Sequence, residues 1–403
     1  MFAYEPQHEM ARDMVRAWCE SKLLPAIPAM ERGELLPYNL MREMSNTFGL
    51  GAMVQMQVEK KIERLKAGKV DKDEGPARDD PLLAYVVVKE LSRVSPGFAM
   101  GFGVTVGLAA QAILRKGTAE QVDRWASDAL TLKKISSWCL TEPGAGSDAF
   151  GSMRSTAKWD GTQWVINGQK TFITNGPFAD LFVVYVRLDD GSPVPEGEKV
   201  PVGTFVLERG MPGLTTSKPM HKMGMKDSPT GEVFMDNVKV GDEYLLGGRK
   251  ASTRASAKES LGDERSGLPA MALGIIERCY ELSLKYAKER KQFGKPIAEF
   301  QAVQLKLSKM YIHLKNVENI MLRTAWMAKT GVRDMAYICA TKAYVSQASV
   351  EVALDAIQLH GGYGYMEEYH IEKLMRDAKL LEIGAGTTDI NLLTAAKLEL
   401  ERA

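Results

Sequence analysis

The sequence predicts an α+β fold in which a sheet-forming middle region separates two helical regions. Apolar residues recur at helical spacing in the first third, Trp/Val/Ile/Thr-rich segments alternate with turn signals in the middle, and regular helical seams follow. We therefore expect an N-terminal helical domain over 1–134, an antiparallel β-domain or small barrel over 135–250, and a C-terminal four-helix bundle over 251–403.

The first predicted helix carries Met10, Met14 and Trp18 at i, i+4 and i+8, which predicts that these side chains share one face. Pro25 and Pro28 follow, and we expect them to break the helix because proline lacks a backbone donor.

Three more helices are predicted before residue 134, near 38–48, 82–95 and 96–113. The last of these has small apolar residues, as in a helix that packs closely against its neighbours. Residues 58–80 are dense in both charges, which favours a solvated helix followed by a loop.

The middle region contains short turn signals between strand-like segments. Trp159-Asp-Gly-Thr and Asn167-Gly168 are typical of tight turns. We expect strands at Phe182–Leu188, Val202–Glu208 and Glu232–Val240, separated by Gly/Pro/Asp-rich stretches.

A Gly/Ser/Lys-rich linker is expected over 241–260, and the helical period is strong after it. Two apolar seams with alternating spacings of three and four predict helices of a bundle. They consist of Leu268, Met271, Ile275, Cys279, Leu282 and Tyr286, and of Val303, Leu307, Met310, Leu314, Val317 and Met321.

Composition excludes several classes of protein. Lys+Arg 52 against Asp+Glu 51 gives a net charge of +1, which argues against a nucleic-acid-binding protein. The cysteines form no CxxC pair and the 5 histidines are scattered, so we expect isolated buried thiols and no metal site. The start of the chain is not a secretory signal, and we expect no membrane span and a cytoplasmic location.

Two glycine-containing strings lie in the middle region. Trp138–Asp148 reads WCLTEPGAGSD, a strand running into a turn whose N–H groups can approach a planar or phosphate-bearing ligand. Gly168–Gly176 reads GQKTFITNG. By composition alone, the first is also compatible with an ordinary β-turn and the second with an edge strand.

Three further strings lie in the C-terminal region. Glu289–Ile297 reads ERKQFGKPI and is, taken alone, a basic helix end favoured by the helix dipole. Gln358–Tyr365 reads QLHGGYGY, where a helix stops at a glycine pair; His360 is expected to be structural or cofactor-lining. Residues 376–391 read RDAKLLEIGAGTTDIN.

These five strings closely resemble the signatures of the acyl-CoA dehydrogenase family, and they occur in the family's order. The resemblance implies the acyl-CoA dehydrogenase fold and an FAD cofactor. Phe172, where the family more often has Trp, and Thr174 would lie against the isoalloxazine ring, and Arg290 would reach the FAD of a neighbouring subunit. The cofactor-binding residues implied are Trp138, Leu140, Thr141, Gly146, Ser147, Phe172, Thr174, Arg290, Gln292, Phe293, Gln301, Gln358, Gly361, Gly362, Thr387, Thr388 and Asp389.

The base is the main departure from the family pattern. Most members hold, within the last signature, a glutamate that removes the substrate's α-proton, and here that position is Ala385. A minority, including isovaleryl-CoA dehydrogenases, carry the base in a D-x-E-R segment at the start of another helix. This chain reads Gly262-Asp-Glu-Arg265, so the resemblance implies that Glu264 is the base. Taken alone, Glu264 is also compatible with an acidic residue stabilised by a helix N-terminus.

The remaining substrate contacts follow from the same resemblance. Asp263 is the nearest rival base, but its side chain would point about 100° away from that of Glu264 on a helix. Gly384 and Ala385 remove bulk where most relatives have larger side chains, which predicts room for branched or wide acyl groups. The substrate contacts implied are Ser147, Asp263, Arg265, Gly384 and Ala385.

The resemblance thus implies FAD-dependent 2,3-dehydrogenation of an acyl-CoA thioester by a homotetramer that passes electrons to electron-transfer flavoprotein. Two alternatives stay open. One is a non-catalytic flavin-binding subunit of a hetero-oligomer, and the other is a flavin oxidase or monooxygenase on the same fold.

Overall fold

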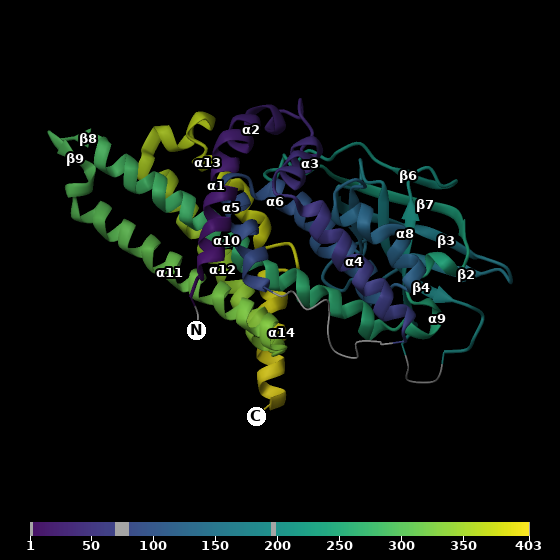
Figure 1. The fold of residues 1–403 in the computed structure, drawn as a ribbon. Coiled ribbons are helices and arrows are strands. Elements are labelled where there is room, and N and C mark those ends of the chain that lie inside the picture. Colours follow the sequence, from purple (N-terminus) through teal and green to yellow (C-terminus); the bar gives the residue numbers. More distant parts are fainter. Residues whose placement is uncertain (1–2, 69–79, 195–198, 403) are drawn as a thin grey trace.

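The structure is a computed structural model that describes residues 3–68, 80–194 and 199–402. Helical, sheet-containing and helical regions follow one another, as predicted. Figure 1 shows an elongated molecule with the sheet at one end and a small hairpin, β8 (Lys291–Gln292) and β9 (Lys295–Pro296), at the other. Helices from the first and last regions pack together between these ends.

The first helix, α1 (Pro6–Trp18), contains all three residues of the predicted helical stripe. Of these residues, Trp18 is buried, whereas Met10 is 65% exposed and Met14 is 52% exposed. The other buried residues of this helix are His8 and Val15.

The predicted break at Pro25 and Pro28 is also wrong. A π-helical turn at Cys19–Leu23 leads directly into α2 (Leu24–Glu31), which contains both prolines. Pro25 lies in the first turn of α2, where a missing N–H group costs little, and the wide turn before it accommodates the ring.

Two of the other N-terminal helices, α3 (Tyr38–Thr47) and α5 (Pro81–Val94), lie close to their predicted positions. The structure adds α8 (Ala119–Leu130), which was not predicted, and α4 (Leu50–Lys66), which begins before the predicted charged helix. The first part of the charged stretch 58–80 belongs to α4, and most of the loop predicted after it falls on 69–79, outside the described residues.

One helix is longer and more apolar than expected. Pro96–Lys116 consists of α6 (Pro96–Gly103), a π-helical segment (Val104–Ala109) and α7 (Ala110–Lys116). Contrary to the prediction, its 21 residues are long and apolar enough to cross a membrane, and 67% of its apolar window is buried inside the protein. This burial is typical of a core helix.

The middle region forms a single seven-stranded sheet of mixed direction, in the order β1-β4-β2-β3-β7-β6 with β5 on the other edge of β4. The predicted antiparallel sheet is corrected here, because β1 and β2 both pair with β4 in parallel. The strands are β1 (Ser136–Cys139), β2 (Thr156–Trp159), β3 (Trp164–Thr174), β4 (Leu181–Asp189), β5 (Val202–Glu208), β6 (Leu214–Thr216) and β7 (Thr230–Val240).

The C-terminal region is a helical bundle, as predicted, but its first helix begins inside the expected linker. A short helix, α9 (Gly248–Ala251), precedes α10, which already starts at Arg254. The long helices are α10 (Arg254–Glu289), α11 (Gln301–Thr330), α12 (Met335–His360) and α14 (Thr388–Arg402), with α13 (Ile371–Leu381) between the last two. The four cysteines are free and buried, as expected.

A buried ion cluster fastens α13 to the loop before β7. The Lys373 ammonium lies 3.2 Å from the Asp227 carboxylate and 2.5 Å from that of Asp377. Asp377 also accepts the backbone N–H of Met225. Because the turn after α13 carries the last signature string, this cluster fixes that turn relative to the sheet.

Candidate active site

A tight turn follows β1 and carries the glycine-rich string. The backbone N–H groups of Glu142 and Ala145 each donate to the other residue's carbonyl, at 3.2 and 3.0 Å. The buried Glu142 carboxylate accepts the N–H of Arg154 at 2.6 Å and the Lys170 ammonium at 2.8 Å. Burial opposes ionisation, but the Lys170 charge and these bonds hold the pKa of Glu142 below its usual value. The turn is thereby anchored from within, while Ser147 stays exposed.

The next string is joined to this turn along β3. The Thr171 N–H donates to the Thr141 carbonyl at 2.9 Å. A register shift between Lys170 and Ile173 marks a β-bulge. Phe172, within the bulge, is 69% exposed with φ 57°, a conformation that costs ~1–3 kcal/mol for a residue with a side chain. The fold thus holds a large aromatic ring out into solvent, beside half-buried Thr174.

Trp138 and Leu140 of the glycine-rich string are less exposed than Ser147 and Phe172. The Trp138 indole is half-buried and its Nε1 donates to the Tyr185 hydroxyl at 3.1 Å. Leu140 is buried in the core of the middle region. Any contact of these two residues with a cofactor would therefore involve mainly their backbone.

The last signature string forms a turn between α13 and α14 whose carbonyls are tied to the bundle. The Ala385 carbonyl accepts from Arg265 Nε at 3.1 Å, and the Gly386 carbonyl accepts from Lys342 Nζ at 2.6 Å. Asn391 Nδ2 donates to the Gly386 and Thr387 carbonyls at 2.7 and 3.0 Å. Ala385 has φ 55°, and its N–H has no acceptor among the residues that the structure describes. The turn therefore presents a free backbone donor.

The residues at the end of this turn begin α14. Thr387 Oγ1 accepts the N–H of Ile390 at 3.3 Å, and Thr388 donates its N–H to the Glu382 carbonyl at 2.9 Å. Asp389 is exposed in the first turn of the helix. A side chain at Gly384 would meet only the Leu380 carbonyl, at 3.5 Å, so space is open there.

Glu264 lies on α10, whose neighbouring residue Arg265 contacts the turn. Its carboxylate makes no hydrogen bond or ion pair with any residue of the described part of the chain, and it is half-buried. Burial raises its pKa to about 7, against the opposing charges of Arg265 and Lys342. A carboxylate with this pKa is ionised in part at neutral pH and is a stronger base than an ordinary glutamate. The side chain of Asp263 lies outside those described.

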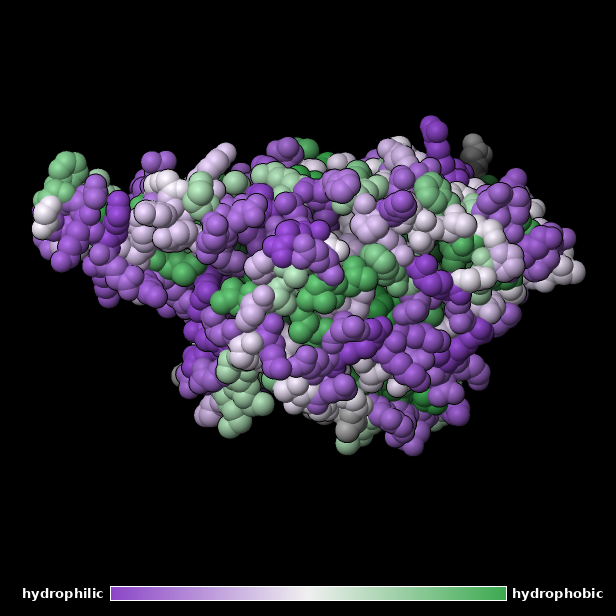
Figure 2. Space-filling view, turned by 90° about the horizontal axis from the view of Figure 1, so that it is seen from above, coloured by the Kyte–Doolittle hydropathy of each residue, from purple (hydrophilic) through white to green (hydrophobic). Residues whose placement is uncertain are grey.

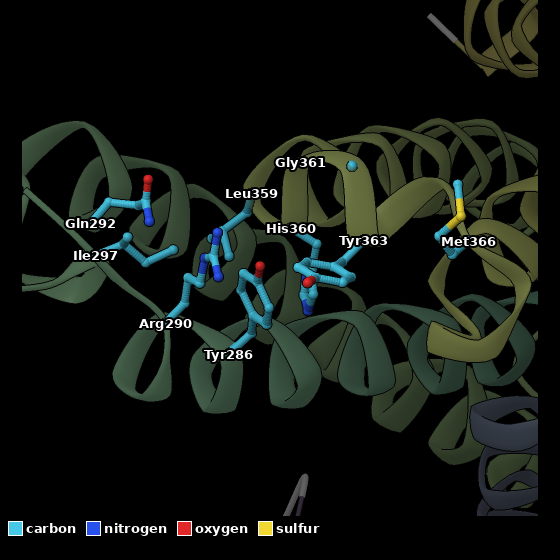
Figure 3. A pocket seen from close by; sticks show the side chains of 10 residues that line it. Tyr286, Arg290, Gln292, Ile297, Leu359, His360, Gly361, Tyr363 and Met366 are labelled. Atoms are coloured by element: carbon cyan, nitrogen blue, oxygen red, sulfur yellow. The ribbon is translucent and has the colours of Figure 1, made fainter.

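A pocket of about 580 Å³ lies at the far end of α10 (Figure 3). Arg290 and Gln292 line it on one side, and Gly361 and Gly362 on the other. In Figure 3 the Tyr286 ring lies between Arg290 and the end of α12. Gln301 and Gln358 are exposed and do not line this pocket.

His360 is part of the pocket wall. Its ring stacks on Tyr286, with centroids 4.2 Å apart and planes at 27°. His360 Nδ1 lies 2.8 Å from the Ala356 carbonyl, so Nδ1 carries the hydrogen. Burial lowers the pKa of His360, which keeps the ring neutral at physiological pH. Phe293 lies beyond this pocket, 92% exposed with φ 53°.

The predicted site residues thus fall into two groups that a single chain cannot bring together. The helix rise of about 1.5 Å per residue places Arg290 roughly 40 Å from Glu264 along α10. Figure 1 shows the β8–β9 hairpin and the sheet at opposite ends of the molecule. One group lies on the sheet and the neighbouring part of the bundle, and the other at the hairpin end.

Sequence reasoning missed Lys342 and Asn391, the two side chains that hold the carbonyls of the turn. A signal was present for Lys342. It stands on the same face of α12 as the buried residues Cys339, Val345 and Ser349, where a lysine is unusual. Asn391 gives no such signal, because an asparagine in the first turn of a helix is common.

Three family models match the chain. They describe the N-terminal, middle and C-terminal domains of acyl-CoA dehydrogenase, at residues 5–133, 137–238 and 254–399. A 3-(aryl)acrylate reductase of Clostridium sporogenes is 30% identical over 393 residues, covering 98% of each chain. The chain belongs to the acyl-CoA dehydrogenase family. The solved structure of butyryl-CoA dehydrogenase from Megasphaera elsdenii superimposes with a TM-score of 0.87 at 29% identity, covering 99% of this chain and 100% of that one.

Two further relatives and one further solved structure are similar to the chain. Isovaleryl-CoA dehydrogenase of Arabidopsis thaliana is 34% identical over 312 residues, 77% of this chain and 75% of its own. CarC, a subunit of the caffeyl-CoA reductase-Etf complex of Acetobacterium woodii, is 30% identical over 99% of this chain and 100% of its own. A glutaryl-CoA dehydrogenase of Mycobacterium smegmatis, solved in complex with FADH2, has a TM-score of 0.85 at 25% identity, covering 98% of this chain and 95% of that one.

Proposed function

We propose that this protein is an FAD-dependent enzyme that removes hydrogen from C2 and C3 of an acyl-CoA thioester, with Glu264 as the base. The observation that carries the proposal is the half-buried Glu264 carboxylate, which has no partner among the residues that the structure describes and lies on the helix next to a turn whose family base position is Ala385. Glu264 would take the α-proton as the C2–H bond breaks, and a C2=C3 bond would form. Bound FAD would supply the acceptor for the hydride that leaves C3.

The residues on the sheet fit a flavin. The isoalloxazine ring of a flavin can pack against an aromatic side chain. The bulge at Phe172 keeps such a side chain exposed, at a cost in backbone strain. The Thr171 N–H bonds to the Thr141 carbonyl, which joins the strand segment before Phe172 to the anchored turn after β1. We propose that these residues hold the flavin of their own chain.

The hairpin-end pocket fits the remaining part of FAD in a second subunit. Arg290 offers paired donors that suit a pyrophosphate, and the His360 and Tyr286 rings offer stacking surfaces. Because this pocket is roughly 40 Å from Glu264 along α10, it can complete a site only on another chain. We therefore propose a homo-oligomer, and a tetramer as in the family pattern.

Exposed apolar side chains support this assembly. Leu305 and Ile312 on α11 are 68% and 57% exposed, and Leu393 and Leu400 on α14 are 68% and 79% exposed. Figure 2 shows green apolar atoms breaking the purple surface in the middle of the molecule and at the hairpin tip. These are surfaces that a second copy of the chain would cover.

The thioester end of the substrate would meet the turn between α13 and α14. The free N–H of Ala385 can donate to the thioester oxygen, which stabilises the charge that develops there when the α-proton leaves. Arg265 is already bound to the Ala385 carbonyl, so we propose that it shapes this turn in addition to any contact with CoA. The open space at Gly384 supports a branched or wide acyl group.

The same site can also work in reverse. A glutamate whose pKa is about 7 is present in both protonation states at neutral pH, so Glu264 can return a proton to C2 of a 2-enoyl thioester. Two relatives carry reductase names. We propose electron-transfer flavoprotein as the electron partner in either direction.

The test is anaerobic mixing of the purified flavoprotein with an acyl-CoA panel, in which flavin absorbance is followed in wild type, Glu264→Gln and Asp263→Asn. We expect bleaching in wild type, none in Glu264→Gln, and a smaller loss in Asp263→Asn. Full bleaching in Glu264→Gln would end the assignment of the base. A wild type that no thioester bleaches would favour the non-catalytic subunit, and rapid reoxidation by air would favour the oxidase.

A further inference from the structure

The bundle contains a buried lysine that no described carboxylate contacts directly. Lys342 lies on α12 and is 0% exposed, yet no ion pair within 4.0 Å is found for it among the described residues. Its ammonium donates instead to the Gly386 carbonyl at 2.6 Å. Burying an ammonium is costly, so a lysine that serves packing alone is unusual at such a position.

The bond from Lys342 is one of a set that fixes the turn from three helices. Arg265 of α10 holds the Ala385 carbonyl, Asn391 of α14 holds the Gly386 and Thr387 carbonyls, and Ser346 of α12 donates to the Leu381 carbonyl at 2.9 Å. Two of these donors are cations and two are neutral. A turn held only for its shape could be held by neutral donors, as Ser346 and Asn391 show.

The charged groups around the turn can be named element by element. Glu264 and Arg265 face Lys342 from α10, and Cys339 lies on its own helix, with Sγ accepting from Arg265 at 3.5 Å. Glu382 follows α13 and is already paired with Lys379. Asp389 of α14 is exposed. Glu264 is thus the carboxylate near Lys342 that has no partner of its own within the described ranges.

We propose that Lys342 is a positioning residue of the active site: it holds the turn that presents the Ala385 N–H, and with Arg265 it supplies a positive field that favours the ionised form of Glu264. The effect of Lys342 on catalysis rests on the proposed function. The effect of its charge on the protonation of Glu264 does not. This role gives a reason for the buried Lys342 of α12 to lie on the helix that packs against α10, which carries Glu264.

The consequence is a rate of flavin reduction that rises and then falls with pH. The base must be a carboxylate, so the rate rises through the pKa of Glu264, near 7. Burial and the charge of Arg265 lower the pKa of Lys342 to about 8, so above that pH the charged donor that holds the Gly386 carbonyl, and with it the turn, is lost, whereas Glu264 stays ionised. The rate should therefore fall again on the alkaline side.

Three variants separate charge from packing. Lys342→Met removes the charge and keeps most of the side-chain volume. We expect the rising limb of its pH–rate profile for flavin reduction to move to higher pH by about one unit, which lowers the rate at pH 7 about fivefold. Lys342→Arg keeps the charge at all accessible pH, so its rising limb should stay and its falling limb should disappear. Ser346→Ala removes a neutral bond to the same turn, and it should lower stability without moving either limb.

A second readout does not depend on turnover. Infrared difference spectra, recorded as the holoenzyme is titrated, follow protonation of the Glu264 carboxyl, and Glu264→Gln identifies its band. We expect this titration to move to higher pH in Lys342→Met and to stay in Ser346→Ala. An unmoved Glu264 titration in folded Lys342→Met would overturn the inference, as would a falling limb that persists in Lys342→Arg. In a third outcome, no thioester of the panel bleaches the flavin of the wild type while the Glu264 titration still moves in Lys342→Met. That result would reject the proposed function and keep the effect of the Lys342 charge on Glu264.

Discussion

Replacing Glu264 with glutamine should make the protein more stable and catalytically inert at once. A carboxyl whose pKa is higher in the folded than in the unfolded state costs stability as it ionises. The cost is absent below the unfolded pKa of 4.5, grows as pH rises towards the folded value of about 7, and is constant above it. Glutamine keeps the shape of the side chain and removes the ionisation.

The size of this gain follows from the shift. A rise from 4.5 to about 7 corresponds to about 3.5 kcal/mol at most, at about 1.4 kcal/mol per pH unit. The carboxylate is only half-buried, and solvent screens part of this cost, so we expect ~1–2 kcal/mol at pH 8 and little at pH 5. The rate of flavin reduction should fall by ~10²–10⁴ or more, the usual contribution of a general base.

Glu277 provides a control on the same helix with the opposite sign. It is paired with Lys89 at 2.8 Å and with Arg16, and these cations hold its pKa below the usual value despite burial. Its contribution to stability is therefore present at neutral pH and lost as pH falls. Glu277→Gln should destabilise the protein and leave flavin reduction in place.

The assay is thermal melting of the holoenzyme at pH 5 and pH 8, with rapid-mixing measurements of flavin reduction. The difference in melting temperature between Glu264→Gln and wild type should grow from pH 5 to pH 8. If Glu264→Gln melts lower than wild type at pH 8, Glu264 is an ion-paired structural residue and the reasoning is refuted.

Three more predictions concern the cofactor, the substrate and the core. Phe172→Ala should lower FAD occupancy after gel filtration, whereas Met56→Ala, an equally exposed side chain at 69%, should not. Gly384→Leu should shift the preference, measured as kcat/KM, from isovaleryl-CoA or isobutyryl-CoA towards straight chains of equal carbon count, because it fills the open space; an unchanged ratio would reject the pocket argument. Lys373→Met should lower the free energy of unfolding in urea by ~3–5 kcal/mol, because two buried carboxylates lose their shared cation, and a loss below 1 kcal/mol would contradict the role of that cluster.

Local signals were sufficient for most helices and strands but not for how they pair. The sequence pattern placed α3, α5 and the strands β4, β5 and β7 within a few residues of their positions. The parallel pairings of β4 with β1 and β2 join segments distant in sequence, and alternation of side chains does not reveal direction. The exposed Met10 and Met14 show a related limit, because the buried face is chosen by the neighbouring helices.

The candidate site could be predicted in part for a similar physical reason. The residues that we propose to face a ligand lie in short strings, so Phe172, Glu264 and Arg290 could be proposed from the sequence. Lys342 and Asn391 act from within the bundle on backbone carbonyls, and nothing local links them to the turn that they hold. The 40 Å separation between Glu264 and Arg290 also required the full length of α10.

The central claim is that Glu264 removes the α-proton, and it can be measured apart from hydride transfer. An acyl-CoA with no hydrogen on C3, such as 3,3-dimethylbutyryl-CoA, cannot be oxidised at C2–C3, but its α-proton can still exchange with solvent. We expect the wild-type holoenzyme to incorporate deuterium at C2 in D2O, as followed by NMR, and Glu264→Gln to incorporate none above the rate without enzyme. Equal exchange by Glu264→Gln, or no exchange by wild type with the thioester bound, would contradict the assignment.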